Sequence, residues 1–357
     1  MIRSGKFSEN RILLVDKERK SRNDRTWCFW EKKQGFFEDI VYRRWPLLDF
    51  ISPQFSRQLD ISPYQYKMIR GIDFYEYCFR EIARHNNIEL INMEIDEATI
   101  HNKKALLHIG GYTIDRSETV IFNSIYPAAA KAKRQPTGLL QHFKGWIVET
   151  DKASFDPAIA TLMDFRVSQE RGTTFVYVMP FSERQALIEY TLFSSHLLDP
   201  AEYDGQLSRY IRETLKIENY RIIDKESGVI PMTDRHYRFD AHGLYHIGTA
   251  GGQTKASSGY TFQFIQKQSQ RITDCLVSGH PLPALKTFPK RFLFYDKVFL
   301  RVLSRGKPGG DIIFSRLFRQ NSASTVLKFL DNETSLGEEI KLLSTLPLLP
   351  FLKASIL

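Results

Sequence analysis

The chain has 357 residues, a formal net charge of +9 and a hydrophobic content of 42%, which together allow two packed domains with an ample core. Its three cysteines, Cys28, Cys78 and Cys275, are widely spaced and form neither a metal-binding pattern nor a disulfide framework, so we expect a reducing, cytoplasmic location. We recognise no signal peptide, and the longest apolar run, Leu342 to Leu352, is about half the length of a transmembrane helix and contains two prolines.

The first predicted element is the apolar run Arg11 to Asp16, which ends in a carboxylate. Continuous apolar residues are typical of a parallel strand that is buried on both faces. In dinucleotide-binding folds the first strand ends in a G-x-G-x-x-G turn, and the second ends in an acidic residue that binds the ribose. Only ten residues precede Arg11, with Gly5 as their one glycine, so for such a domain we expect a start codon assigned too late or a truncated product.

The middle of the chain alternates between short strands and single helices. We predict an amphipathic helix over Phe74 to Arg84, a β-meander from Ile88 to Ile114 and a buried strand over Thr119 to Asn123. Longer antiparallel strands follow at Trp146–Glu149, Ala160–Gln169, Thr173–Pro180 and Gln185–Thr191, and then a helix at Asp204–Leu215. Because aromatic residues alternate along these strands, we expect their sheet to wall a cavity for an apolar ligand.

A loop of small residues, Gly248 to Phe262, follows the short strand-like run Leu244 to Ile247. The next helix is predicted over Tyr260 to Ser278, with Ser257 or Ser258 as its N-cap. Such a loop and helix N-terminus present free backbone N–H groups and a positive dipole end, which suit a phosphate or the pyrimidine carbonyls of a flavin. Glycines in strand-to-helix turns also serve the turn alone, so this motif by itself does not assign a ligand.

The last quarter of the chain is predicted to be helical and strongly basic. The segment from Pro281 to Leu330 has ten Lys or Arg residues against two Asp residues, interleaved with apolar and aromatic residues. This combination favours a surface that rests on anionic lipid headgroups. Nucleic-acid binding and a solvated basic face are the alternatives, and no nucleic-acid motif accompanies the patch. His236, His242 and His246 fit no common zinc spacing, so we expect no metal site.

Several segments carry a resemblance to a known family. They are Asn23–Trp30 (Asn-Asp-Arg-Thr-Trp-Cys-Phe-Trp), Thr174–Phe181 with Ala186–Thr191, Gly228–Thr233 and the Gly248–Phe262 loop. In this order and spacing they resemble the bacterial lycopene cyclases of the flavoprotein type, which make β-ionone rings. The resemblance extends from about Arg11 into the C-terminal helices.

The resemblance implies an α/β fold. Its parts are a Rossmann-like FAD-binding domain of the glutathione-reductase type, N-terminally truncated, an inserted antiparallel-sheet substrate domain and a C-terminal helical region. We expect residues 1–135 and 240–280 to form the FAD-binding domain, residues 136–239 the substrate-binding domain and residues 281–357 a membrane-proximal helical region.

The resemblance also implies an activity, an isomerisation or intramolecular lyase reaction that closes the ψ end groups of lycopene into β rings without net redox change. It implies reduced FAD, with NADPH as the usual reductant, and a peripheral position at the cytoplasmic membrane, where the carotenoid dissolves. Asp16 matches the family's ribose-binding acid. The residues that match its flavin segment are Gly248, Gly251, Gly252, Gly259 and Tyr260. Arg70 stands where flavoproteins often place a flavin-contacting Arg, and a surface salt bridge is the alternative.

Ring closure of a polyene begins with protonation of a terminal alkene carbon, so it needs a carboxylic acid that is protonated at working pH. Burial raises the pKa of a carboxyl, which suits Glu189, and this residue also matches the acid of the family's catalytic motif. The alternative for Glu189 is a solvent-facing or salt-bridged strand carboxylate. Asp164 is a candidate second acid, or else a hydrogen-bonding group at a strand end, and we interpret Glu226 as a structural partner of the turn at Gly228.

Two other functions fit these residues. One is an FAD-dependent monooxygenase that oxidises an apolar substrate with O₂. The other is a carotenoid-binding protein without catalysis. Turnover without oxygen would separate the isomerisation from the first, and pigment retained without flavin would favour the second.

Overall fold

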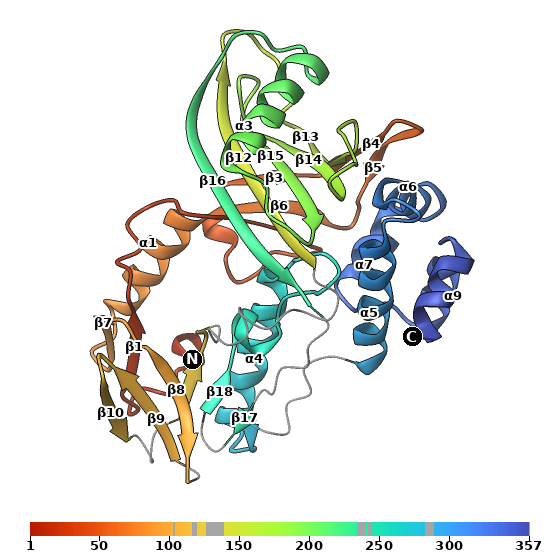
Figure 1. Cartoon of the computed structure of the whole chain (residues 1–357). Coiled ribbons are helices and arrows are strands. Elements are labelled where there is room, and N and C mark those ends of the chain that lie inside the picture. The colour runs from red at the N-terminus through yellow and green to blue at the C-terminus, as the bar shows by residue number, and fades with distance from the viewer. Residues whose placement is uncertain are drawn as a thin grey trace.

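The computed structural model describes residues 1–102, 104–115, 120–125, 139–233, 240–241, 244–282 and 289–356. In Figure 1 a large sheet with one covering helix stands above several small sheets, and the C-terminal helices lie along one side of both. The predicted starts of two segments, Thr119 and Pro136, lie outside the described residues, as do His236 and His242.

A seven-stranded sheet forms the centre of the molecule. Its strands, in spatial order, are β16 (Tyr220–Met232), β12 (Leu139–Thr150), β15 (Gln185–Ser194), β14 (Thr173–Pro180), β13 (Ile159–Asp164), β4 (Leu47–Ser52) and β5 (Phe55–Asp60). Neighbouring strands are antiparallel except β13 and β4, which are parallel. The antiparallel strands predicted between residues 146 and 191 are therefore confirmed. The β4–β5 hairpin, which no prediction covered, extends their sheet with residues from the first part of the chain.

Alternation along the strands separates two cores. On one face Trp146, Ile188 and Tyr190 pack under α3 (Pro200–Arg209) and the π-helical turn Tyr210–Thr214. On the other face aromatic and aliphatic side chains meet the C-terminal helices and a second sheet. We call this second face the inner face, and Glu189 points to it because it alternates with Ile188 and Tyr190.

The remaining described strands form four smaller sheets. The sheet that packs near the inner face has the order β2 (Thr26–Glu31), β6 (Gln65–Arg70) and β3 (Arg43–Trp45). The predicted meander is confirmed from Glu97 onward as β8 (Glu97–His101), β9 (Lys104–Ile109) and β10 (Tyr112–Asp115). Its predicted start was wrong, because Ile88–Asn92 pairs in parallel with Ile12–Asp16 instead. Two parallel pairs remain, β1 (Ile12–Asp16) with β7 (Ile88–Asn92), and β11 (Ile121–Asn123) with β18 (Leu244–His246), the latter extended by β17 (Asp240–Ala241).

The prediction of a fully buried first strand was wrong. β1 is parallel, as expected, but Leu13 and Leu14 are 50% and 39% exposed. The reason is that among the described residues β1 has one hydrogen-bonded neighbour, β7, so less surface covers its side chains.

The predicted helices before the last quarter are confirmed as α1 (Gly71–Ile82) and α4 (Phe262–Val277). The N-cap of α4 is Thr261, so the predicted caps Ser257 and Ser258 were wrong. The Ser257 hydroxyl donates to Asp296, and the Ser258 N–H closes a turn onto the carbonyl of Lys255, so both residues are held in the loop before the helix.

The last quarter is helical, as predicted. Its helices are α5 (Lys290–Arg305), α6 (Gly310–Gln320), α7 (Ala323–Leu330), α8 (Leu336–Leu343) and α9 (Leu348–Ile356). Ser322 caps α7, and Ser335 forms a capping box with Glu338 at α8, which explains where these two short helices begin. Among the described residues, no helix combines the length and the apolar character that crossing a bilayer demands.

A buried ion pair ties the loop before α4 to the C-terminal helices. The Lys255 ammonium, whose side chain has no exposed surface, lies 2.6 Å from Asp296 on α5 and donates to Asn332 at 2.9 Å. Ser257 donates to the same Asp296 oxygen at 2.7 Å. This pair fixes the loop over the inner face of the sheet.

We predict that Lys255→Met lowers the free energy of unfolding by about 3–5 kcal/mol, because it leaves the Asp296 carboxylate buried without its cation. Lys267→Met is the matched control, since its pair with Glu333 is partly exposed and should contribute less than about 1 kcal/mol. Urea unfolding followed by tryptophan fluorescence measures both. Equal effects of the two substitutions would contradict the prediction.

Candidate functional site

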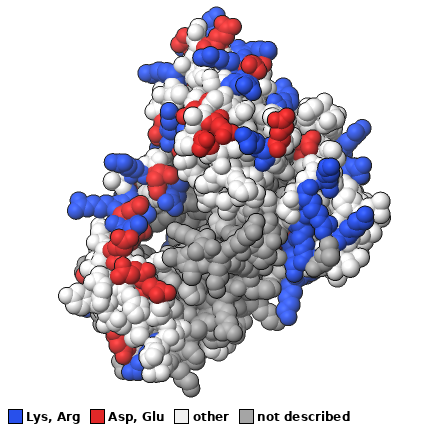
Figure 2. All heavy atoms as spheres, viewed as in Figure 1, with Lys and Arg blue, Asp and Glu red and all other residues white. Residues whose placement is uncertain are grey.

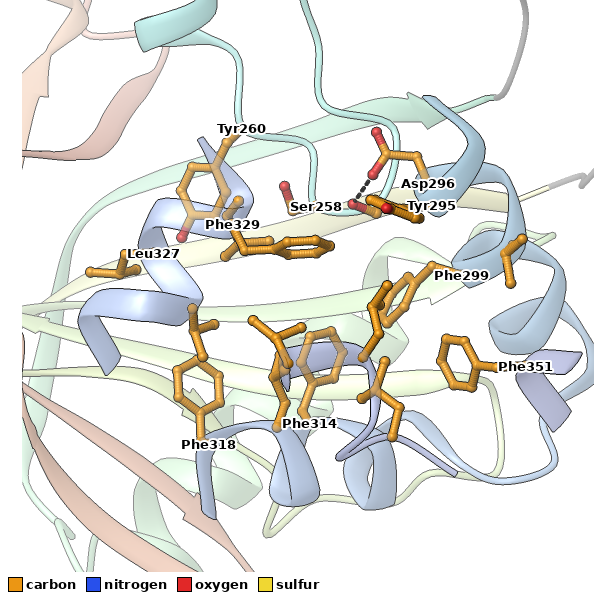
Figure 3. A pocket seen from close by; sticks show the side chains of 18 of the residues that line it. Ser258, Tyr260, Tyr295, Asp296, Phe299, Phe314, Phe318, Leu327, Phe329 and Phe351 are labelled. Carbon is orange, nitrogen blue, oxygen red and sulfur yellow. Dashed lines mark hydrogen bonds between the residues drawn. The ribbon is translucent and has the colours of Figure 1, made fainter. Parts of the chain in front are cut away.

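An apolar cavity of about 340 Å³ lies between the inner face of the sheet and the C-terminal helices (Figure 3). Its walls include Phe299 on α5, Phe314 and Phe318 on α6, Phe329 on α7 and Phe351 on α9. The volume is within the range of small-molecule sites, roughly 300–1,000 Å³. The surface that lines it is almost entirely apolar, so it suits a hydrocarbon better than a polar ligand.

The inner end of the cavity is closed by rings with polar tips. Trp30, Tyr177 and Tyr260 line it, Tyr260 hydrogen-bonds to Tyr177, and its hydroxyl lies 3.3 Å from that of Tyr66. Burial raises the pKa of Tyr177 well above its ordinary value, so its phenol is neutral at working pH. The Trp30 indole donates to Asp331 at 2.9 Å, and burial raises the pKa of Asp331 to about 7.

The outer end of the cavity reaches the protein surface at α9. Leu348 and Leu352 on α9 and Phe294 on α5 line the cavity and are also 63%, 48% and 48% exposed. In Figure 3, Tyr260 and Phe351 mark opposite ends of the space. A linear apolar molecule that entered at α9 would therefore point toward Tyr177.

Glu189 lies next to Tyr177, which is its Cα partner on β14 and faces the same side of the sheet. The residue is only 8% exposed, and Thr191 donates a hydrogen bond to its Oε1 at 3.0 Å. Burial raises the pKa of the Glu189 carboxyl well above its ordinary value, and the negative charge of Glu226 raises it further. The protonated form of this carboxyl is therefore favoured, and the solvent-facing alternative does not hold.

Glu226, which our sequence interpretation treated as structural, lies beside Glu189. The two side chains adjoin each other above Gly145, and Thr26 donates to Glu226 Oε2 at 2.7 Å. Burial also raises the pKa of the Glu226 carboxyl. The one signal for this residue in the sequence was its position two residues before Gly228, where a segment that carries the family resemblance begins.

Asp164 lies on the opposite side of the sheet from Glu189. Arg166 donates to both of its carboxylate oxygens, and Tyr210 donates to Oδ2 at 2.7 Å. These partners belong to the face that α3 covers, so the sheet separates Asp164 from the cavity. A strand-end hydrogen-bonding group is the interpretation that these contacts favour.

Two different constraints require glycine at positions in the Gly248–Phe262 loop, a positive φ angle and a lack of space for a side chain. Gly248, Gly252 and Gly259 have positive φ angles of 61°, 74° and 74°, which favour glycine. A Cβ at Gly251 would lie 2.2 Å from the carbonyl oxygen of His246, so no side chain fits there. Tyr260, the last matched residue of this segment, reaches the cavity.

Three buried polar atoms beside this loop have no hydrogen-bond partner among the described residues. They are Oε1 of Gln141, Oγ of Ser258 and Nε2 of Gln268. A Cβ at Gly259 would lie 2.1 Å from Gln141 Oε1, and one at Gly251 would lie 3.7 Å from Gln268 Nε2. Unsatisfied buried groups cost free energy, so they indicate a polar ligand against the loop.

The other two predicted cofactor residues, Asp16 and Arg70, each have polar partners within the protein. Asp16 ends β1, where its Oδ1 accepts from the N–H of Glu18 at 2.9 Å and Lys20 lies 3.5 Å away. Arg70 forms two hydrogen bonds with Asp73 and lies over the ring of Tyr42 at 4.1 Å. The salt-bridge alternative for Arg70 is therefore present. Its hydrogen-bonding atoms Nε and Nη2 are already engaged.

Within the described ranges, no group of three or more His, Cys, Asp or Glu side chains is arranged to hold a metal ion. His246 lies on β18, where burial lowers its pKa.

Comparison with known proteins connects this site to a family. The family described as "Lycopene cyclase protein" matches residues 6–356. The chain belongs to the lycopene cyclase family. It is 22% identical over 365 residues to the lycopene beta-cyclase of Pantoea ananas, and this alignment covers 96% of the chain and 90% of that protein.

Solved structures share the fold of this lycopene cyclase family member. A geranylgeranyl bacteriochlorophyll reductase-like protein from Thermoplasma acidophilum matches with a TM-score of 0.57 at 13% identity, over 99% of this chain and 91% of that chain. A variant of Klebsiella pneumoniae HpxO complexed with FAD matches with a TM-score of 0.54 at 11% identity, over 95% and 93%. The predicted α/β flavoprotein fold class is confirmed, whereas the predicted domain boundaries remain predictions.

We predict that Gly259→Ala destabilises the loop by at least about 1 kcal/mol, because alanine is strained at a φ of 74° and its Cβ would overlap Gln141. It should also weaken the binding of FAD, the cofactor that we propose below. Gly205→Ala in α3 is the control, since a Cβ there meets nothing within 4 Å. Alanine should stabilise that helix by roughly 0.5–1 kcal/mol. Thermal unfolding and flavin fluorescence titration measure the two effects, and an unchanged Gly259→Ala protein would refute the prediction.

Proposed function

We propose that this protein is a lycopene β-cyclase, which converts the ψ end groups of lycopene into β-ionone rings by acid catalysis without net oxidation or reduction. One observation carries the proposal: Glu189, whose protonated form is favoured by its burial, adjoins the inner end of an apolar cavity that opens at the surface. The family membership supports the same substrate class.

The proposed first step is proton transfer from the Glu189 carboxyl to the terminal alkene carbon of the end group. A neighbouring double bond then attacks the resulting tertiary cation and closes the ring, and loss of another proton completes the isomerisation. Tyr177 and Trp30 present aromatic rings at the inner end, and each desolvated cation–π contact stabilises a cation by up to about 2 kcal/mol. The apolar walls exclude the water that would quench the cation.

We further propose that the protein binds FAD, which acts in its reduced form with NADPH as the reductant. The residues present fit this cofactor, because the glycine loop at the start of α4 leaves Gln141, Ser258 and Gln268 with unsatisfied buried atoms. Gly248, Gly251 and Gly252 would offer backbone N–H groups to it. Asp16 would bind the ribose and Tyr260 would lie at the ring system. When bound, the reduced flavin would supply negative charge that favours a nearby carbocation.

We predict that Glu189→Gln folds normally and forms no β rings, with activity reduced at least about 10³-fold, because the amide cannot donate a proton to carbon. The assay supplies lycopene in liposomes with dithionite-reduced FAD under anaerobic conditions, and chromatography separates the pigments. Glu183→Gln, at an exposed position, is the control and should keep full activity. Normal turnover by Glu189→Gln would remove the assignment.

The same assay separates the monooxygenase alternative, which shares the fold. Ring formation without oxygen supports the cyclase, whereas an oxygenated product that forms only in air supports the monooxygenase.

We also propose that the C-terminal helices rest on a membrane surface. The cavity mouth is surrounded by exposed apolar side chains of α8 and α9: Leu336, Ile340, Leu348, Leu349, Leu352 and Ile356. Exposed basic residues stand on the neighbouring α5 and α6 and on the turn between them: Lys290, Arg305, Lys307, Arg316 and Arg319. Figure 2 shows Lys and Arg gathered on the flank that these helices form. Apolar side chains among basic ones are typical of surfaces that bind anionic lipid.

We predict that the double substitution Leu349→Ser/Ile356→Ser lowers binding to phosphatidylglycerol-containing vesicles more than tenfold, since each buried side chain contributes about 1.5–3 kcal/mol. Neither residue lines the cavity, so detergent-based turnover should remain. Leu197→Ser is the control, because Leu197 is 54% exposed and lies after β15, outside the C-terminal helices. Vesicle co-sedimentation at two salt concentrations measures the effect, and equal binding by all three proteins would contradict it.

A further inference from the structure

We propose that Glu226 is a positioning residue of this reaction, which shares a single proton with Glu189 and keeps that proton on Glu189 until the substrate takes it. The inference rests on the proposed function, in which Glu189 is the proton donor. It assigns a role to a residue that the sequence left as structural.

The sheet brings the two carboxyl groups together across a residue that has no side chain. Gly145 on β12 is the Cα partner of Glu189 on β15 and also of Glu226 on β16. A Cβ at Gly145 would lie 3.2 Å from Cγ of Glu226, 3.5 Å from Cβ of Glu189 and 2.9 Å from Leu187. The two acidic side chains therefore occupy the space above Gly145, and a side chain at that position would separate them.

Two threonines orient the pair from its outer sides. Thr26 donates to Oε2 of Glu226 at 2.7 Å, and Thr191 donates to Oε1 of Glu189 at 3.0 Å. Thr26 comes from β2, so a separate sheet contributes to the site. Since an ionised carboxylate only accepts hydrogen bonds, the adjoining Glu189 and Glu226 can share a hydrogen bond only when one of them carries a proton.

The surroundings retain one proton on the pair. Cys28, Tyr177 and Tyr260 adjoin Glu189, and each of these groups is neutral because burial raises its pKa above its ordinary value. The charged neighbour that acts on Glu226 is Asp224, which is also negative. Two adjacent carboxylates cannot both ionise easily, so one stays protonated at a pH where an isolated Glu would not.

The pair also closes the proton balance of the isomerisation. The O–H bond of Glu189 breaks as a C–H bond forms at the end of the substrate. The pair then carries two negative charges and binds a proton strongly, so it accepts the proton that leaves the ring carbon. One C–C bond has formed, the pair again holds one proton, and no oxidant or reductant has been consumed.

The test is the pH dependence of kcat in Glu226→Gln, with lycopene in liposomes and dithionite-reduced FAD. Removing the negative charge of Glu226 makes Glu189 lose its proton more easily. We therefore expect the high-pH limb of the profile to move at least one pH unit toward acid and the rate above that limb to fall about tenfold. Glu218→Gln, at an exposed position, should leave the limb unchanged.

Gly145→Ala provides a second variant that retains both carboxyl groups and separates them by one methyl group. It should move the limb in the same direction, whereas Gly205→Ala should not. Glu226→Asp retains the charge, so it should lower the rate while leaving the limb closer to that of the unaltered protein. If Glu226→Gln does not fold, the limb of Gly145→Ala decides the question.

An unchanged limb in the folded variants, with a merely lower rate, would overturn the inference and leave Glu226 structural. That result is distinguishable from failure of the proposed function. An active Glu189→Gln protein removes the donor itself, whereas an inactive Glu189→Gln together with an unshifted Glu226→Gln removes only the proton-sharing role.

Discussion

Burying two carboxyl groups side by side is unfavourable, and the surrounding structure is organised around this constraint. Glu189 and Glu226 meet above Gly145, and one threonine from each of two sheets satisfies an outer oxygen. Burial and mutual repulsion then keep a proton on the pair, since the charged form is disfavoured. The preference for the protonated form is thus a property of the sheet and of its cover, more than of either glutamate alone.

The cover explains why the loop before α4 and the C-terminal helices belong to the same site. Tyr260, at the end of the loop, contacts Tyr177 and closes the cavity beside Glu189. The loop is fixed in turn by Lys255, whose buried pair with Asp296 joins it to α5. Ser257 and Asp296 also line the cavity, but they are engaged in holding the loop, and the rest of the lining is apolar and suits a hydrocarbon.

The sequence identified the parts of the fold that depend on local pattern. Periodicity predicted the antiparallel strands and the helical last quarter, and small residues located the Gly248–Phe262 loop. The sequence predictions failed where contacts with neighbouring segments determine the structure. The strand ending at Asp16 has a buried-strand pattern but one paired neighbour, and Ser257 has a capping side chain that Asp296 already engages.

Glu226 shows why a site can exceed what a motif reveals. Alternation places Glu189 on one face of its strand, and that much follows from the sequence. Which residue stands opposite depends on the register of β15, β12 and β16, which are separated in the chain by tens of residues. A shift of β16 by one residue would turn Glu226 to the other face and leave Glu189 with a different neighbour. The pairing of these two acids is therefore a tertiary property. The role of Gly145 between them can be recognised only once that register is known.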